Sequence, residues 1–260
     1  MSARPVVGLC VDQSPGSPGF HRIVFIHGAM DRVTSFSRVR LRLGSHPTVA
    51  YDRRGYANSV GMPRAVSFDD HVNDLLSVVD GQPSVLVGHS YGGNVALAVA
   101  ARQPDLVSAM VVFEAPMSWE PWWPSTAGSS TLAVGEAEGP EAAAESFMRR
   151  IVGDRTWEKL SERTKADRRA EGQALLFDLA GLRGRGCPYD VGAIRCPTAV
   201  AHGELSLAHQ IESSVILHER LSCKRVLHCV EGAGHGAHSS HPDAFANLVT
   251  EAVAMIGPLD

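Results

Sequence analysis

The sequence predicts an α/β fold, with a mainly parallel sheet that is covered by helices on both faces and carries an inserted helical cap. Short apolar, β-branched runs alternate with segments of helical periodicity, which is the pattern of parallel strands joined by crossover helices. The alternation stops after Pro116 and resumes at Cys196. These observations divide the 260 residues into a core, residues 1–116 and 196–260, and a cap, residues 117–195.

Six apolar runs are the expected strands. Each is short and rich in apolar residues, as expected of strands buried on both faces of a parallel sheet. Residues 14–19, which precede the first run, contain only serine, proline and glycine and are expected to form a loop. The runs are Ile23 to Ile26, Thr48 to Tyr51, Ser84 to Val87, Val107 to Phe113, Thr198 to Ala201 and Arg225 to Val230.

Helical spacing of apolar residues predicts the covering helices. Ser67 is the expected N-cap of one of them, with acidic residues in its first turn. Another follows residue 93 and ends at Pro104. The remaining core helices are expected at about 31–43, 209–221 and 242–256, and the cap helices at about 141–152, 156–165 and 168–182, after a glycine- and serine-rich stretch at 127–139.

Composition excludes several classes of protein. With 44% hydrophobic and 20% charged residues the chain is expected to fold by itself. The formal net charge of −4, without long runs of like charge, argues against a nucleic-acid partner. We expect no signal peptide and no membrane partner, because no window approaches ~18 apolar residues. Five cysteines without a CxxC pair or zinc spacing favour a reduced, cytoplasmic location.

Gly88-His89-Ser90-Tyr91-Gly92 carries the strongest chemical signal. It matches the GxSxG pattern, with an apolar strand before it and a helix of small residues after it. Such a turn exposes a serine hydroxyl above the sheet, so we expect Ser90 to be a nucleophile. The backbone N–H of Tyr91, at the start of the helix, is expected to stabilise an oxyanion.

The segment His27-Gly28-Ala29-Met30 follows the first of these strands. In this arrangement its loop supplies the second oxyanion donor, which we assign to the backbone N–H of Ala29. Met30 is a candidate lining residue of a substrate pocket. By itself, the His27-Gly28 pair would be weak evidence for an oxyanion donor, because a simple strand-ending turn has the same pattern.

His235 lies between the last strand and the last helix, in Gly232-Ala233-Gly234-His235. A loop imidazole there reaches back to the nucleophile and suits a general base. His238 and His241 continue a spacing of three, but no carboxylate or cysteine pattern accompanies them, and we expect no metal site.

The chain resembles the α/β-hydrolase superfamily over nearly its whole length. The resemblance comes from the His27-Gly28 loop, Asp52-Arg53-Arg54-Gly55, the GxSxG turn, the position of the cap, Cys196-Pro197-Thr198 and the His235 loop. Many relatives carry the triad aspartate after the penultimate strand, in a pattern like HGExD. Here Ser206 stands at that position. The Asp52 segment is expected to organise loops beside the site.

A second acid position exists in this superfamily, at the end of the strand after the nucleophile, and Glu114 stands there. The surrounding segment is similar to that of haloalkane dehalogenases and luciferase-like relatives, which use such a glutamate. The dehalogenases have an aspartate nucleophile, so Ser90 argues against dehalogenation. A charged glutamate after four apolar residues needs a partner, and His235 is the natural one. Glu204 is the competing acid.

Trp119, Trp122 and Trp123 lie near the beginning of the cap. They are candidates to line an apolar pocket, and equally to pack the cap against the core.

The resemblance implies a serine-dependent hydrolase of a small ester, thioester, lactone or related acyl compound, which forms an acyl-enzyme and requires no cofactor. A C–C bond hydrolase or an acyltransferase would use the same groups. The rival from another class is a non-catalytic ligand receptor on this fold. The sequence points to a small-molecule partner and leaves substrate and oligomeric state open.

Overall fold

The computed structural model describes residues 8–258 and contains a seven-stranded sheet, mostly parallel, so the predicted fold class is confirmed. The strand order is β1-β3-β2-β4-β5-β6-β7, and only β1 runs antiparallel to its neighbour. The strands are β1 (Val11–Ser14), β2 (Ile23–Ile26), β3 (Thr48–Tyr51), β4 (Ser84–His89), β5 (Val107–Phe113), β6 (Thr198–Gly203) and β7 (Arg225–Val230).

Strand β1 is the element of the sheet that the sequence did not predict. It pairs along the edge of β3, from Val11 opposite Tyr51 to Ser14 opposite Thr48. Its residues are largely exposed, so it lacks the apolar pattern of the buried strands. Pairing with β3 therefore decides its conformation, as is common for an edge strand.

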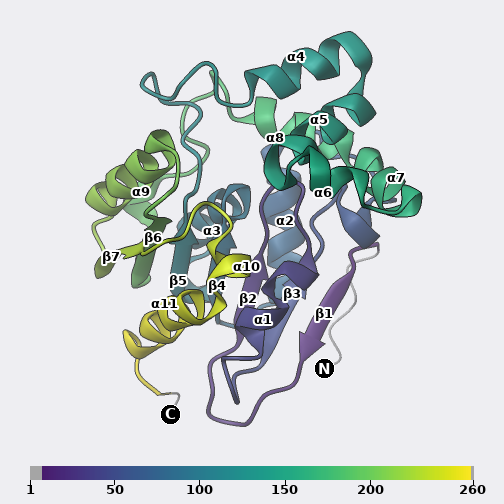
Figure 1. The fold of residues 1–260 in the computed structure, drawn as a ribbon. Helices are drawn as coiled ribbons and strands as arrows, with labels where there is room; N and C mark the ends of the chain where they lie inside the picture. The colour runs from purple at the N-terminus through teal and green to yellow at the C-terminus, as the bar shows by residue number, and fades with distance from the viewer. Residues whose placement is uncertain (1–7, 259–260) are drawn as a thin grey trace.

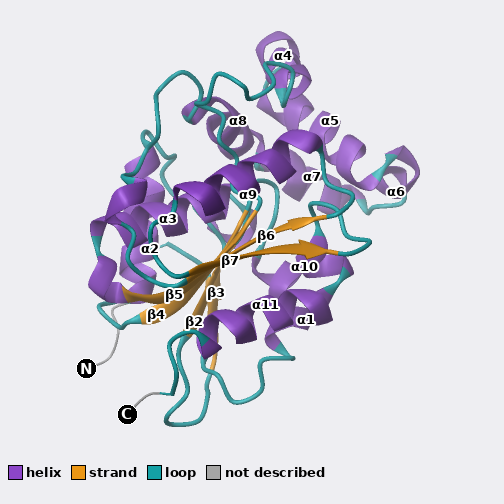
Figure 2. Ribbon diagram, turned by 90° about the vertical axis from the view of Figure 1, so that its left-hand side faces the viewer, coloured by secondary structure: helices purple, strands orange, loops and turns teal. Residues whose placement is uncertain are grey.

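Helices cover both faces of the sheet, which Figure 2 shows nearly edge-on. Each face carries one of the two large apolar clusters. One face packs against α2 (Phe68–Val79), α3 (Tyr91–Arg102) and α9 (Ala208–Arg220), and the other against α1 (Ser37–Arg40), α10 (Ala237–Ser240) and α11 (Pro242–Ala254). Short 3-10 turns occupy Val33–Phe36, Ala57–Ser59, Pro104–Leu106 and Val191–Ala193.

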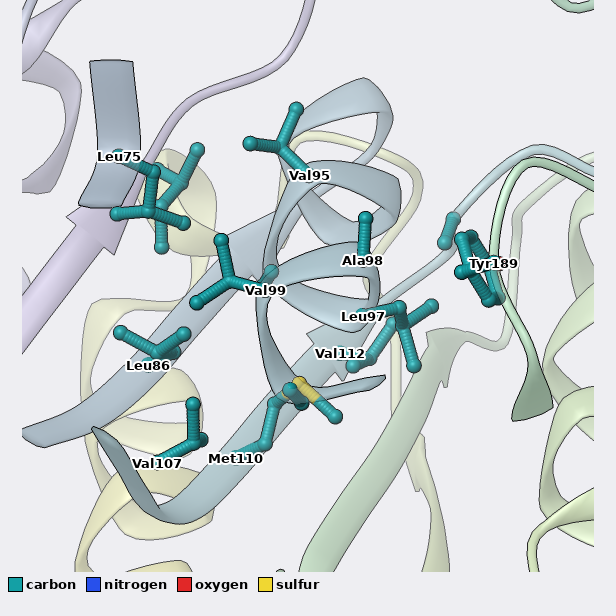
Figure 3. Packing of buried hydrophobic residues seen from close by; sticks show 14 of the residues in the cluster. Leu75, Leu86, Val95, Leu97, Ala98, Val99, Val107, Met110, Val112 and Tyr189 are labelled. Atoms are coloured by element: carbon teal, nitrogen blue, oxygen red, sulfur yellow. The ribbon is translucent and has the colours of Figure 1, made fainter. Parts of the chain in front are cut away.

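The alternation of side chains along β2 shows how the strands serve both clusters. Val24 and Ile26 belong to the cluster under α3, whereas Ile23 and Phe25 belong to the opposite one, and all four are fully buried. Figure 3 shows the first cluster, where α3 lies against β4 and β5. Burial of each large apolar side chain contributes about 1.5–3 kcal/mol, so this core fixes the strand ends that carry the polar residues.

Helix α2 begins as predicted. Ser67 and Asp70 form a capping box, in which the Asp70 carboxylate accepts the backbone N–H of Ser67 at 2.9 Å. The helix ends at Asp80, whose backbone is left-handed.

Between β5 and β6 the chain forms a group of helices that lies beyond the carboxyl ends of the strands (Figure 1). The glycine- and serine-rich stretch at 127–139, for which no helix was expected, is helical at residues 129–138. A Cβ at Gly135 would lie 2.6 Å from the side chain of Leu176, so the glycine allows close packing of two helices. The helix predicted at 156–165 is split in two, since Ser161 caps a new helix within it. These helices are α4 (Ser129–Glu138), α5 (Pro140–Val152), α6 (Asp154–Glu158), α7 (Glu162–Ala170) and α8 (Gly172–Gly181).

None of the helices within residues 8–258 combines the length and the apolar character needed to cross a bilayer.

Candidate active site

Ser90 stands at the sharp turn between β4 and α3. Its backbone has a φ of 54° and a ψ of −127°, which residues other than glycine rarely adopt. The neighbouring glycines make room for the turn. A Cβ at Gly92 would lie 2.3 Å from the carbonyl oxygen of Ile26, and a Cβ at Gly88 would lie 2.6 Å from the Cα of Gly93. The turn therefore places Ser90 at the carboxyl edge of the sheet.

Glu114 directly follows β5, the strand beside β4, and its φ of 49° is also left-handed. Its Oε1 atom accepts the backbone N–H of Gly203 at 2.7 Å and the hydroxyl of Ser206 at 2.5 Å. Its Oε2 atom lies 2.5 Å from Nδ1 of His235. The carboxylate is thus held by donors from the end of β6, from the loop after it and from the loop after β7.

These donors decide the charge of Glu114. Burial by itself would raise the pKa of this carboxyl, but the hydrogen bonds from His235, Ser206 and Gly203 outweigh burial, and the pKa is lowered. Because an ionised carboxylate only accepts hydrogen bonds, Nδ1 of His235 carries a proton. The Nε2 atom of the neutral imidazole then has a free lone pair.

His235 lies in the loop after β7, and its side chain is 33% exposed. In residues 8–258, no hydrogen bond joins it to the hydroxyl of Ser90. Such contacts are often long before a substrate binds. The structure therefore brings His235 to Glu114, and both to the edge of the sheet where Ser90 stands.

Glu204, the competing acid in the sequence, has another partner. Its Oε2 atom accepts the backbone N–H of Gly232 at 2.8 Å. No ion pair or hydrogen bond connects Glu204 with His235 in the described part of the chain. Glu204 thus ties the loop after β6 to the turn before His235.

The predicted oxyanion donors are both near Ser90. A Cβ at Gly28 would lie 2.8 Å from the Cβ of Ser90, so the loop that contains Gly28 and Ala29 passes directly beside the serine. Tyr91 is the first residue of α3, where a helix N–H has no partner within the helix. Neither the Ala29 nor the Tyr91 amide donates a hydrogen bond within residues 8–258.

His27 holds the loop that carries Ala29. Its Nδ1 atom donates to the carbonyl oxygen of Gly28 at 2.7 Å, and its Nε2 atom accepts the backbone N–H of Arg53 at 2.8 Å. Since one nitrogen must donate and the other accept, the ring is neutral. Burial, followed by the charge of Arg53, lowers the pKa of His27 to about 4.

Met30 lies where this loop meets the inserted helices. It is buried in a small apolar cluster with Tyr56, Met148, Trp157 and Leu175. Its positive φ of 54° turns the chain toward those helices. Met30 is therefore a contact between the loop after β2 and the helices that lie between β5 and β6.

A fully buried ion pair joins the core to α8. The guanidinium of Arg53 donates to the carboxylate of Asp178, which also accepts the hydroxyl of Tyr56 at 2.8 Å. Burial would lower the pKa of Arg53, but Asp178 reverses this effect and raises it. Burial raises the pKa of Asp178 to about 6, so the pair is ionic at neutral pH. No sequence motif marked Asp178.

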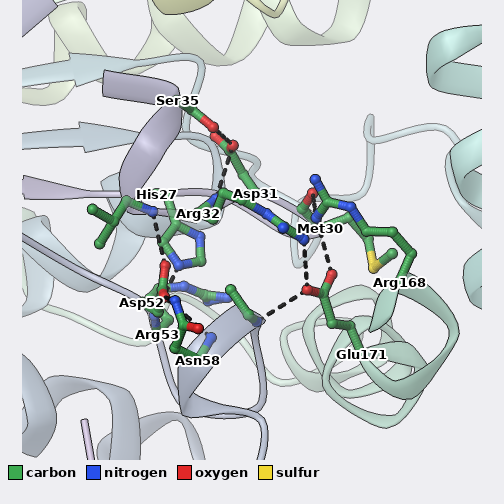
Figure 4. Close-up of polar contacts among 12 residues, drawn as sticks. His27, Met30, Asp31, Arg32, Ser35, Asp52, Arg53, Asn58, Arg168 and Glu171 are labelled. Carbon is green, nitrogen blue, oxygen red and sulfur yellow. Dashed lines mark hydrogen bonds and ion pairs between the residues drawn. The ribbon is translucent and has the colours of Figure 1, made fainter. Parts of the chain in front are cut away.

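Glu171 forms a second junction, which Figure 4 shows beside the loop of Met30. Its Oε1 atom accepts Arg32 at 2.9 Å and the backbone N–H of Ala57 at 3.0 Å, and its Oε2 atom accepts Arg168 at 3.1 Å. Arg168 also donates to the carbonyl oxygen of Met30 at 3.1 Å. The insertion is thereby tied to the loop that carries the predicted oxyanion donor.

Asp52 organises the loops beside the site, as expected from its segment. Its carboxylate accepts the backbone N–H of Val33 at 2.8 Å and the side chain of Asn58 at 2.9 Å (Figure 4).

The three tryptophans lie between the large apolar cluster and α9. Trp119 packs edge-on against Tyr189, and Trp123 lies 4.6 Å, centroid to centroid, from the ring of His209. Burial and the charge of His235 lower the pKa of His209, so His209 lies near His235. Of the three tryptophans, Trp123 is therefore the one whose ring contacts a residue near the site. The ring of Trp122 lies 5.9 Å, centroid to centroid, from that of Trp123, with a tilt of 55° between the ring planes. All three therefore have a packing role.

Asp31, His89 and His238 form a cluster that the sequence did not predict. One ligand-type atom from each lies within 4.8 Å of the others. The three-residue spacing of His235, His238 and His241 does not create this group; His238 instead meets side chains from the loop after β2 and from the end of β4. Only the fold places these residues together.

The parallel sheet, the turn at Ser90 and the loop of His235 define an alpha/beta hydrolase fold. A family model described as the alpha/beta hydrolase family matches residues 23–248, so the chain belongs to this family. Two curated relatives match along most of their length. Mouse (Mus musculus) sn-1-specific diacylglycerol lipase ABHD11 is 27% identical over 89% of this chain and 80% of its own. Esterase Rv0045c of Mycobacterium tuberculosis is 26% identical over 88% and 81%.

Other relatives share only part of their length with this chain. Lipase LipV of Mycobacterium tuberculosis is 38% identical, over 39% of this chain and 40% of its own. The chain thus spans less than half of the length of this relative. Among solved structures, bromoperoxidase from Bacillus anthracis has a TM-score of 0.76 at 19% identity, with 95% of both chains covered. That likeness shows the fold alone.

Proposed function

We propose that this chain is an esterase-like serine hydrolase, which cleaves a small ester, thioester, lactone or related acyl compound through an acyl-enzyme on Ser90. The observation that carries the proposal is the 2.5 Å contact between Glu114 and His235, at the sheet edge where the strained turn presents Ser90. The relatives named lipase and esterase support the same class of reaction.

In this mechanism Nε2 of His235 removes the proton of Ser90 as Oγ attacks the acyl carbon, and then returns it to the leaving group. The carbonyl oxygen becomes an oxyanion, which the Ala29 and Tyr91 amides stabilise; loss of one such donor typically costs about 3 kcal/mol of barrier. Water, activated by His235, then releases the acid. Glu114 holds the Nδ1–H tautomer and stabilises the imidazolium. No step requires a cofactor.

The helices between β5 and β6 are the cap in this proposal, with the boundaries 117–195, and the core comprises 1–116 and 196–260, of which residues 1–7 and 259–260 lie outside the described structure. Met30 and the three tryptophans would line the path of the substrate where cap and core meet. The five cysteines, all free in the described residues, support a reduced compartment such as the cytoplasm.

The test is hydrolysis of p-nitrophenyl acetate and butyrate by the wild type and by Ser90→Ala. We expect Ser90→Ala to lose at least about 10³-fold in kcat, because removal of a triad nucleophile has effects of this size or larger. Ser77→Ala is the matched control, since Ser77 lies exposed on α2 and donates only to a backbone carbonyl. A fluorophosphonate should label the wild type and not Ser90→Ala.

Wild type that is inert on these esters and on a wider acyl panel, and that is not labelled, would contradict the proposal. A non-catalytic ligand receptor would then be the better interpretation. A C–C bond hydrolase or an acyltransferase would retain labelling of Ser90 but would turn over diketones or transfer the acyl group.

A further inference from the structure

Three imidazole rings lie together at the carboxyl edge of the sheet. The ring of His89 is 4.7 Å, centroid to centroid, from that of His235 and 4.2 Å from that of His238. His89 precedes Ser90 at the end of β4, and His238 belongs to α10. The proposed function uses only His235, so the roles of the other two rings are open.

His89 makes a direct contact with the loop of His235. Its Nε2 atom lies 2.7 Å from the backbone carbonyl oxygen of His235. A carbonyl only accepts, so Nε2 of His89 donates, and the tautomer of this ring is fixed. Burial, followed by the charges of His238 and His235, lowers the pKa of His89 well below its usual value, so the ring is neutral.

The contact matters because it is made by His235 itself, whereas the other bonds of this loop are made by neighbouring residues: Gly232 donates to Glu204 at 2.8 Å, and the carbonyl of Ala233 accepts the N–H of Leu205 at 2.8 Å. His235 stands between Gly234 and Gly236, and glycine is the residue with the greatest backbone freedom. The Glu114 carboxylate fixes one nitrogen of the ring but not the peptide that follows it. The bond from His89 fixes that peptide.

Asp31 holds His238, whose ring packs against that of His89. Its Oδ1 atom accepts the backbone N–H of Arg32 at 2.9 Å and the hydroxyl of Ser35. Its Oδ2 atom lies 3.0 Å from Nε2 of His238 and 3.9 Å from Nδ1 of His89. His89 thus lies against two side chains that are themselves anchored, one in the loop after β2 and one in α10.

We propose that His89 is a positioning residue for His235, and that the ring of His238, which Asp31 holds, packs against His89 and keeps it in place. The bond between Nε2 of His89 and the His235 carbonyl sets the distance from the base to Ser90, which stands next to His89 in the chain. This inference rests on the proposed function. Displacement of a catalytic group by about 1 Å can cost ~10²-fold in rate, so a misplaced loop would be visible in kcat.

The same three side chains have the chemistry of a metal site, with two imidazoles and one carboxylate. Their internal contacts favour the positioning role, because Asp31 already meets His238 at 3.0 Å and His89 already donates to the carbonyl. Metal binding is therefore an outcome for the test to distinguish.

The test compares His89→Phe, which keeps a ring but loses the donor, with His89→Gln, whose amide donates from a similar position. We expect His89→Phe to lose about 10- to 100-fold in kcat with KM nearly unchanged, and His89→Gln to recover most of it. His238→Gln, one step removed, should lose several-fold. The rate of fluorophosphonate labelling should fall in parallel with kcat.

His21→Phe is the matched control. His21 is also a buried histidine whose Nε2 atom bonds a backbone carbonyl at 2.7 Å, that of Gly257, but it precedes β2 at the opposite end of that strand from the His27 loop. It should lower Tm about as much as His89→Phe while kcat stays at the wild-type value. This comparison separates positioning from a general loss of stability.

The pH profile of kcat gives a further readout. The groups that face His235 are Glu114, His89 and His209, with Asp31 and His238 behind His89. Because Glu114 is intact in His89→Phe, the decline of kcat at acidic pH should keep its shape, while the maximum value of kcat falls.

If the wild type is active and His89→Phe has the same kcat, the inference is wrong and the proposed function stands. Wild type without turnover or labelling would overturn both. Zinc chloride that inhibits the wild type at micromolar concentration, is reversed by a chelator and has no effect on Asp31→Asn or His238→Gln would assign the cluster to a metal and overturn the positioning role.

Discussion

The carboxyl edge of the sheet and the junction with the inserted helices both contain buried charged groups, but they are assembled differently. At the edge, Ser90 and Glu114 directly follow adjacent strands, and the backbone N–H of Gly203 helps to hold the carboxylate. At the junction, Arg53 and Asp178 come from positions 125 residues apart and meet through side chains alone. The ends of adjacent strands therefore place Ser90 and Glu114 through backbone geometry, whereas the junction depends on the contacts of individual side chains, such as Asp178 and Glu171.

The first prediction tests the edge. Glu114→Gln should lower kcat for p-nitrophenyl butyrate by about 10³- to 10⁴-fold, because the amide no longer holds the correct imidazole tautomer or stabilises the imidazolium. Steady-state kinetics on the purified variant provides the measurement. Glu204→Gln, which changes only the contact to Gly232, should stay within about tenfold of the wild type. The reverse order of the two effects would make Glu204 the acid.

This edge is the part of the molecule that could be predicted from sequence. GxSxG, a glutamate after an apolar strand and a histidine after the last strand are local patterns, and parallel strands bring their carboxyl ends together. The edge strand β1 could not be predicted, because its conformation comes from β3. Nor could the cluster of Asp31, His89 and His238, since its members belong to three distant segments.

The second prediction breaks the junction. Asp178→Ala leaves Arg53 buried without its counter-ion, and removal of one partner of such a pair typically costs about 3–5 kcal/mol. The free energy of unfolding in urea should fall by this amount. The double variant Arg53→Met/Asp178→Leu should be more stable than Asp178→Ala, because no unpaired charge stays buried. Equal stability of wild type and Asp178→Ala would show that the pair contributes nothing.

The third prediction concerns pH and the loop that joins the two regions. The pKa of His27 is about 4 in the folded chain and about 6.5 when unfolded. Between these values the unfolded chain binds a proton that the folded chain does not, so the free energy of unfolding falls as pH falls from 6.5 to 4. His27 alone accounts for about 3 kcal/mol across this window.

Asp178, whose pKa is raised, acts in the opposite direction, so the measurement is a difference. Urea unfolding of the wild type and of His27→Gln at pH 7, 5.5 and 4.5 provides it. His27→Gln should be less stable at pH 7 and should lose less on acidification. Parallel curves for the two proteins would contradict the assignment of a neutral, buried His27.

The smallest predicted effect is that of a substitution at the carboxyl edge of the sheet. Ser206→Ala removes one donor to Glu114 but leaves the N–H of Gly203 and the contact with His235. One hydrogen bond contributes about 1 kcal/mol, so kcat should fall roughly fivefold. Loss of kcat as large as that of Glu114→Gln would show that the serine is essential to the acid.

The substrate pocket of the proposed function is the part that the sequence predicts least well. Trp119 packs against Tyr189, and Trp123 packs against Trp122 and His209, so tryptophan at these positions indicates packing as much as substrate recognition. The contact of Glu171 with Arg32 depends on how α7 and α8 lie over the core, which no local pattern determines.

The left-handed backbone at position 90 has an evolutionary consequence. A glycine would occupy the φ of 54° without strain, so stability alone would favour glycine at this position, and under the proposed function turnover is what retains the serine. A gene copy released from selection for hydrolysis would be expected to drift toward glycine at this codon early, while the surrounding core stayed unchanged. Paralogues with an intact core and glycine at position 90 would then mark lineages that have lost hydrolysis and retained the fold.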